Sequence, residues 1–139
     1  MLLLAILWIR ILGFSASAIY STAHDLTVGE NASVNVDWQI ADGLLRLGVQ
    51  PGDKVAFIGS SLDFYWARLL RLHTVAEIGQ QDLGYFWAAD PSVKSQVINA
   101  FAGTGAKVIV TRDIPNHSST DGWQKIGDTD HYAHLLPKS

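Results

Sequence analysis

Residues 44–78, LLRLGVQPGDKVAFIGSSLDFYWARLLRLHTVAEI, decide the predicted fold class of this chain. Gly48 ends one helix, and Pro51-Gly52 makes a tight turn into the apolar, β-branched run KVAFI at residues 54–58. Such a run is typical of a strand that is covered on both faces. A helix over residues 60–72 and a second strand over residues 73–78 follow, which predicts parallel strands joined by a right-handed crossover.

The segments around this stretch continue the same pattern of helices and strands. Upstream, residues 35–47 carry apolar side chains at helical spacing and predict a helix. Downstream, residues 79–89 read as a loop that carries the cluster Tyr85-Phe86-Trp87. This cluster could form a hydrophobic lid, a partner-docking surface or a membrane contact, or it could fold back to cover the core.

A further helix and three further strands complete the predicted domain. Asp90-Pro91 is a strong helix start, and the buried stripe of that helix is predicted to be Val93, Val97 and Phe101. The remaining predicted strands are residues 106–111, 123–126 and 131–136. We therefore expect an α/β fold, a three-layer Rossmann-like domain with a small parallel sheet of three strands plus C-terminal strands.

Composition restricts the function classes that are open to the chain. Apolar residues make up 48% of the 139 residues, enough for one core and one domain. A net charge of −3 and an isoelectric point near 5.9 argue against a nucleic-acid partner, which would require a basic face. Because the sequence contains no cysteine, disulfides, thiolate zinc sites and cysteine nucleophiles are excluded.

The amino-terminal segment, MLLLAILWIRILGFSASAIY, differs from the rest of the chain, since Arg10 is its only charged residue. Its length suits a transmembrane helix. A signal peptide with a cleavage site at Ala16-Ser17-Ala18 is a second interpretation, although the basic leader is missing, and a buried core helix is a third. The favoured prediction is a membrane protein with a hydrophobic, transmembrane helix at residues 1–22, a linker at 23–34 and the α/β domain at 35–139. Residues 1–20 would contact the lipid bilayer.

Two candidate ligand-binding features occur near the first two predicted strands. Gly59-Ser60-Ser61 follows the first strand, where nucleotide-binding α/β folds place their phosphate loop, but the G-x-G-x-x-G and Walker patterns are incomplete. Capping of the next helix by Ser60 is the alternative. Glu77 lies about 20 residues after Gly59, where a ribose-binding acid would fall, and a solvated or Arg-paired carboxylate is its alternative role. No catalytic residue and no cofactor are predicted.

Histidines supply the remaining candidate metal ligands. His131 and His134 are three positions apart in a predicted strand, so their side chains should point to opposite faces. No second group of ligands accompanies them. No metal site is predicted.

The chain from Trp38 to its end resembles the carboxy-terminal region of large, uncharacterised bacterial multi-pass membrane proteins. The similarity includes the opening pattern, residues 65–69 (YWARL) with Arg71 and residues 75–78 (VAEI), and then FWAAD at 86–90, TGAKVIV at 104–110 and W-x-x-I-G-D-T at 123–129. The opening pattern consists of Trp38, Ala41, Leu44, Gly48, Pro51, Gly52, Asp53, Val55, Ala56, Ile58 and Gly59. This resemblance implies that the apolar start is a last membrane helix, and it implies no activity.

A second resemblance is to the amino-terminal part of acyl-adenylate-forming ligases. It rests on LGVQPGDKVAFI at residues 47–58 and TGAKVIVT at residues 104–111. The ATP loop that ends in Pro-Lys-Gly in that family is missing, and the chain is too short for that enzyme. The expected function is therefore a membrane-attached, non-catalytic accessory or ligand-binding domain, and the alternative is a nucleotide-binding or ligase-like enzyme fragment.

Overall fold

The computed structural model of the 139-residue chain describes residues 30–60, 64–112 and 114–137, and for residues 30–35 it describes the backbone alone. Contacts divide the chain into two units, Met1–Val36 and Asp37–Ser139, and apart from the helical residues 30–36 the fold below is that of the second unit. The hydrophobic helix predicted for residues 1–22 lies outside the described residues. Within the described ranges, no helix has both the length and the apolar character needed to cross a membrane.

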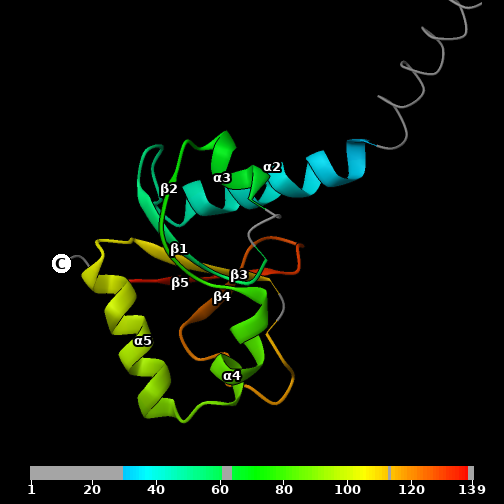
Figure 1. Ribbon diagram of the computed structural model, residues 1–139. Helices are drawn as coiled ribbons and strands as arrows, with labels where there is room; N and C mark the ends of the chain where they lie inside the picture. Colours follow the sequence, from blue (N-terminus) through cyan, green and yellow to red (C-terminus); the bar gives the residue numbers. More distant parts are fainter. Residues whose placement is uncertain (1–29, 61–63, 113, 138–139) are drawn as a thin grey trace, which may run out of the picture. The chain divides into compact units, whose positions relative to one another are not determined.

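The described residues form an α/β fold with four α-helices and a five-stranded mixed sheet (Figure 1). The helices are α2 (Glu30–Arg46), α3 (Tyr65–Leu69), α4 (Leu83–Ala88) and α5 (Pro91–Gly103), with a short 3₁₀ helix η1 (Gln80–Asp82) before α4. The strands are β1 (Lys54–Ile58), β2 (His73–Ile78), β3 (Val108–Arg112), β4 (Trp123–Lys125) and β5 (His131–Leu135). Their order in the sheet is β2-β1-β3-β5-β4.

The centre of the sheet is the parallel set β2-β1-β3, as the sequence predicted. Phe57 of β1 lies opposite Glu77 of β2 on one side and opposite Val110 of β3 on the other. β5 pairs with β3 in the antiparallel direction, and β4 pairs with β5 in the same way. The predicted C-terminal strands therefore extend the parallel core on the β3 side.

Side chains alternate along the central strands and so supply two apolar clusters, one on each face of the sheet. Val55 and Phe57 of β1 pack with residues of α2 and α3 on the first face, which we call the α2/α3 face. Ala56 and Ile58 pack with α4 and α5 on the second, the α4/α5 face. Figure 1 shows these helices on opposite sides of the sheet.

The bounds of two predicted helices differ from those in the structure. α2 begins at Glu30, so the helix starts before the predicted residue 35 and includes the end of the predicted linker. α3 begins only at Tyr65, not at residue 60, and it ends at Leu69. Arg71 adopts a left-handed conformation with φ of 52°, which a continuing helix cannot contain, and the predicted end at residue 72 is therefore wrong.

The predicted loop at residues 79–89 is wrong, because η1 and α4 occupy most of it. Phe86 and Trp87 of α4 are buried and cover the sheet, while Tyr85 is 80% exposed. In α5, Phe101 is buried and Val97 is half-buried, as predicted, but Val93 is 45% exposed. The apolar stripe of α5 therefore reaches the core only in its C-terminal part.

Candidate functional site

A pocket of about 520 Å³ lies at the carboxyl ends of the parallel strands. Gly59 and Ser60 directly follow β1, Gln80 follows β2, and Arg112 ends β3. The complete described lining is Phe57, Gly59, Ser60, Gln80, Leu83, Gly84, Trp87, Arg112, Pro115 and His117. A volume in this range suits a small-molecule ligand.

The topology explains why a pocket forms at this edge. The connection from β1 to β2 runs through α3 on one face of the sheet, and the connection from β2 to β3 runs through α4 and α5 on the other face. The chain that leaves the carboxyl end of β1 goes to β2, whereas the chain that leaves the carboxyl end of β3 goes to β4 and β5 in the opposite direction across the sheet, and β1 and β3 are neighbours. Open α/β sheets bind their ligands in the crevice that forms at such a point.

Gly59 has a conformation that only glycine adopts easily. Its φ is 143°, and its N–H donates a hydrogen bond of 2.9 Å to the carbonyl of Ile78 at the end of β2. A Cβ at this position would lie 2.9 Å from Cε1 of Phe57. The residue therefore ties the ends of β1 and β2 together while letting the chain turn beside the pocket.

The structure places the predicted site residues in different surroundings. Gly59 and Ser60 line the pocket, and Ser61 lies outside the described residues. The N-cap position of α3 is Phe64 and not Ser60, and Phe64 makes no side-chain hydrogen bond there. Glu77 is exposed on β2 and is not among the lining residues.

Sequence reasoning missed Arg112 and His117 as lining residues, and it named Trp87 only as part of a cluster that could form a lid or cover the core. The signal for Arg112 was present, since it is the first charged residue after the apolar strand that begins at Val108. Polar residues directly after a parallel strand face the carboxyl edge of the sheet, where ligands bind. Trp87 could not be identified in this way, because its segment was assigned to a loop.

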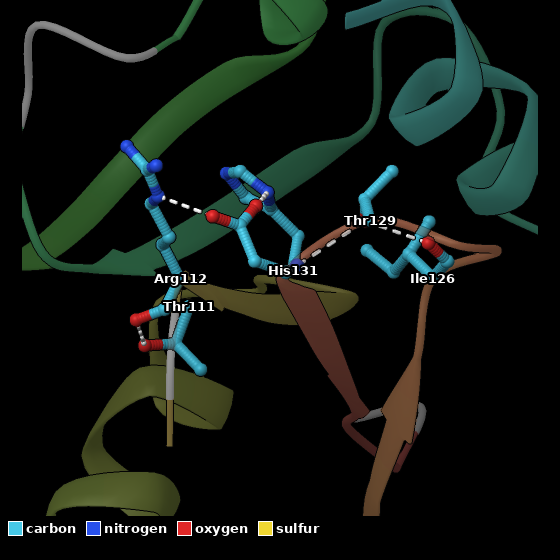
Figure 2. A network of polar contacts seen from close by, with 6 residues as sticks. Thr111, Arg112, Ile126, Thr129 and His131 are labelled. Atoms are coloured by element: carbon cyan, nitrogen blue, oxygen red, sulfur yellow. Dashed lines mark hydrogen bonds and ion pairs between the residues drawn. The ribbon is translucent and has the colours of Figure 1, made fainter. Parts of the chain in front are cut away.

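Arg112 belongs to a polar network that joins the ends of β3 and β5 (Figure 2). Its Nε donates a hydrogen bond of 2.7 Å to Oδ2 of Asp130, and Oδ1 of Asp130 lies 2.9 Å from Nδ1 of His131. Burial alone would raise the pKa of Asp130. The hydrogen bond from Arg112 and the charges of His131 and Arg112 outweigh burial and hold this pKa below its ordinary value.

Threonine hydroxyl groups satisfy buried backbone groups around this network. Thr111 Oγ1 donates a hydrogen bond of 3.0 Å to the carbonyl of Ile58, which links β3 to β1 just below the pocket. Thr129 Oγ1 donates to the carbonyl of Ile126 at 2.6 Å and accepts from the backbone N–H of His131 at 3.2 Å. These bonds fix the turn between β4 and β5 and hold Asp130 next to Arg112.

A chain of ring contacts runs from the pocket across the outer strands. Trp87 lies 5.8 Å from Trp123 between ring centres, and Trp123 lies 5.2 Å from His134. His134 therefore lies on the α4/α5 face, whereas His131 is buried next to Asp130. Burial lowers the pKa of His134, and a backbone hydrogen bond with Gly122 opposes that shift. Among the described residues, no group of three His, Asp or Glu side chains is arranged to hold a metal ion.

The geometry thus provides a half-open pocket with an apolar wall, one arginine and a glycine turn at the ligand-binding edge of a parallel sheet. Such a site can bind and orient a small molecule. Comparison with protein-family models, with curated proteins and with solved structures finds no match to this chain.

Proposed function

We propose that this protein is a membrane-attached, non-catalytic domain that binds a small-molecule ligand. The observation that supports ligand binding is the pocket of about 520 Å³ at the divergence of the β1 and β3 connections. Its described lining residues come from β1 and β3, from the segments that follow these two strands, and from η1 and α4, so several elements of the α/β domain contribute to one site. The arrangement of helices on both faces of a parallel core supports the description as a three-layer, Rossmann-like domain.

The membrane part of the proposal rests on the sequence. Residues 1–20 are long and apolar enough to enter a bilayer, and Arg10 is the one charged residue among them. The resemblance to the ends of bacterial multi-pass membrane proteins supports the same attachment. In this proposal, residues 1–22 anchor the chain in lipid and the α/β domain presents its pocket to the adjoining aqueous phase.

Ligand binding is tested with the full chain in nonionic detergent micelles and a thermal-shift screen of small metabolites. The blocking variant is Gly84→Leu, because Gly84 lines the pocket and a Cβ there meets no atom within 4 Å. The matched control is Gly103→Leu, a helical glycine outside the pocket lining with equally open surroundings. We expect a ligand that raises the melting temperature of the wild type and of the control, and has no effect on Gly84→Leu.

The same screen separates the proposal from the alternative function. If ATP or another nucleotide were the compound that stabilised the chain, the nucleotide-binding or ligase-like reading would replace the present one. Stabilisation of Gly84→Leu and the wild type by the same amount would show that binding occurs elsewhere.

Membrane attachment is tested by fractionating cells that express the full chain. We expect the protein in the membrane pellet after washing with alkaline carbonate, which removes peripheral proteins. A variant with Leu7→Lys and Leu12→Lys should move to the supernatant, because each lysine at the centre of a membrane helix costs about 2.5 to 3.5 kcal/mol. Recovery of the wild-type chain in the supernatant would contradict the proposal.

A further inference from the structure

We infer that the pocket takes a small organic anion, with its carboxylate or phosphate group bound by Arg112 and an apolar body against the hydrophobic wall. This inference rests on the proposed function and specifies the chemical class of the ligand. It follows from three features of the lining: its charge, its apolar surface and the way in which Arg112 is held.

The charge of the described lining is positive. Arg112 carries the permanent charge there, and the other polar side chains are those of Ser60, Gln80 and His117. No aspartate or glutamate is part of the described lining. The guanidinium group presents N–H donors in a planar fork that matches the two oxygens of a carboxylate or phosphate.

The apolar part of the lining calls for more than an inorganic ion. Phe57, Leu83, Trp87 and Pro115 line the pocket together with the arginine. Trp87 is 93% buried in the fold, so its contribution to the lining is a fixed surface, held by Phe86 and Trp123 with ring centres 4.9 and 5.8 Å away. A ligand with an apolar or aromatic body gains free energy on this wall by leaving water.

Arg112 is held in one orientation before a ligand arrives. Asp130 accepts the Nε hydrogen bond, and Asp130 is itself held by His131, whose side chain is only 5% exposed. The side chain of Arg112 is 51% exposed, and Arg112 is one of the residues that line the pocket. Binding to an ordered arginine loses less conformational entropy than binding to a mobile one.

Asp130 also reduces the net positive charge near Arg112. We therefore expect the pocket to prefer organic anions over inorganic ones. A bare inorganic anion gains only from the polar part of the lining, and Asp130 weakens its attraction to Arg112 through repulsion. An organic anion adds the contact with the apolar wall. Inorganic phosphate should therefore bind weakly, and an aromatic carboxylate or phosphate ester should bind measurably.

The test is isothermal titration calorimetry on the full chain in nonionic detergent micelles, with heats from empty micelles subtracted. The probes are phenylacetate, phenyl phosphate, inorganic phosphate and phenylacetamide, which is the neutral analogue of the first. We expect at least one aromatic anion to bind ten times more tightly than phenylacetamide or better. The tighter of the two anions identifies the carboxylate or phosphate as the preferred group.

Arg112→Gln is the deciding variant, and Arg46→Gln is its control. Arg46 is also an exposed arginine paired with an aspartate, Asp42, but it lies on α2 outside the pocket lining. We expect Arg112→Gln to remove the preference for the anion over phenylacetamide and Arg46→Gln to retain it.

Three results would overturn the inference. These are equal binding of phenylacetamide and both aromatic anions, an anion preference that survives in Arg112→Gln, and no binding of any probe. In the first case the pocket would still bind ligands, so the proposed function would stand without its anionic ligand. In the last case the metabolite screen with Gly84→Leu would decide the proposed function independently.

Discussion

On the α2/α3 face, Trp66, Phe57 and Ile40 are at most 1% exposed, whereas on the α4/α5 face Trp87 keeps 7% of its surface exposed and borders the pocket. The second face also depends on many half-buried residues, among them Leu83 and Val97. The two faces of one sheet therefore have different tasks. The α2/α3 face mainly supplies close packing that stabilises the fold, and of its apolar cluster Phe57 also lines the pocket, whereas α4 on the other face contributes Leu83, Gly84 and Trp87 to the lining.

Replacing the two tryptophans by alanine is the strongest test of this difference. Trp66→Ala should lower the free energy of unfolding by about 3 to 5 kcal/mol, because it leaves a cavity in a closed core. Trp87→Ala should cost at least about 1 kcal/mol less, because one side of that ring already faces the pocket. Urea unfolding of both variants, followed by circular dichroism, measures the difference. An equal or larger loss for Trp87→Ala would remove the distinction between the faces.

Gly43 provides a second measure of how tightly the α2/α3 face is packed. A Cβ at Gly43 would lie too close to Cγ2 of Ile126 for either atom to stay in place. Gly43→Ala should therefore lower the free energy of unfolding by about 3 kcal/mol. The double variant with Ile126→Ala should be less destabilised than the sum of the two single variants, since it removes the clashing methyl group. Additive losses would show that the contact is not tight.

Gly59 provides a corresponding test of the turn that follows β1 beside the pocket. Gly59→Ala should cost about 2 kcal/mol, because its φ of 143° is unfavourable for alanine. The control Gly103→Ala has no close neighbour and no positive φ, and it should change stability little. Thermal unfolding of both variants measures the contrast. If the two variants had the same melting temperature, the turn after β1 would not require glycine.

The smallest expected effect comes from the charge pair beside the pocket. The pKa of Asp130 in the folded chain is below its ordinary 3.8, so its stabilising effect is present above about pH 4 and is lost as the pH falls through the folded value. Asp130→Asn should therefore be less stable than the wild type at pH 7. The difference between their free energies of unfolding should be smaller at pH 3. Urea unfolding at the two pH values measures this difference.

Asp128→Asn, an exposed aspartate in the same turn, is the control for that experiment. It removes one negative charge from the turn and leaves the pair of Arg112 and Asp130 intact, so its loss of stability at pH 7 should be smaller than that of Asp130→Asn. A difference for Asp130→Asn that was larger at pH 3 would contradict the direction of the pKa shift.

The strands were the part of the fold that local sequence could predict. β1 and β2 occupy the predicted residues, because each is a short segment with β-branched residues that follows a turn. α4 was missed because its six residues, LGYFWA, include a glycine and are too few for a helical repeat to be visible. Its helical state depends on Phe86 and Trp87 packing on the sheet, which is tertiary information.

The candidate site was predictable only where it follows a strand. Gly59 and Ser60 were identified in this way, and Arg112 could have been identified by the same rule. Trp87 and His117 reach the pocket from α4 and from the segment after β3, so their positions depend on how these parts fold back. Glu77 was selected by its distance from Gly59 along the chain, and spacing alone does not say which side chains share a pocket.

The strand order gives β2 an outer position in the sheet, where only β1 pairs with it among the described strands. An outer strand of six residues offers a row of backbone groups to which a neighbouring molecule could add its own strand. The exposed carboxylate of Glu77 lies on this strand. It would lie next to Glu77 of a second copy if the β2 strands of the two copies paired in the antiparallel direction around this residue. A negative charge at that place discourages two copies from pairing through this edge of the sheet.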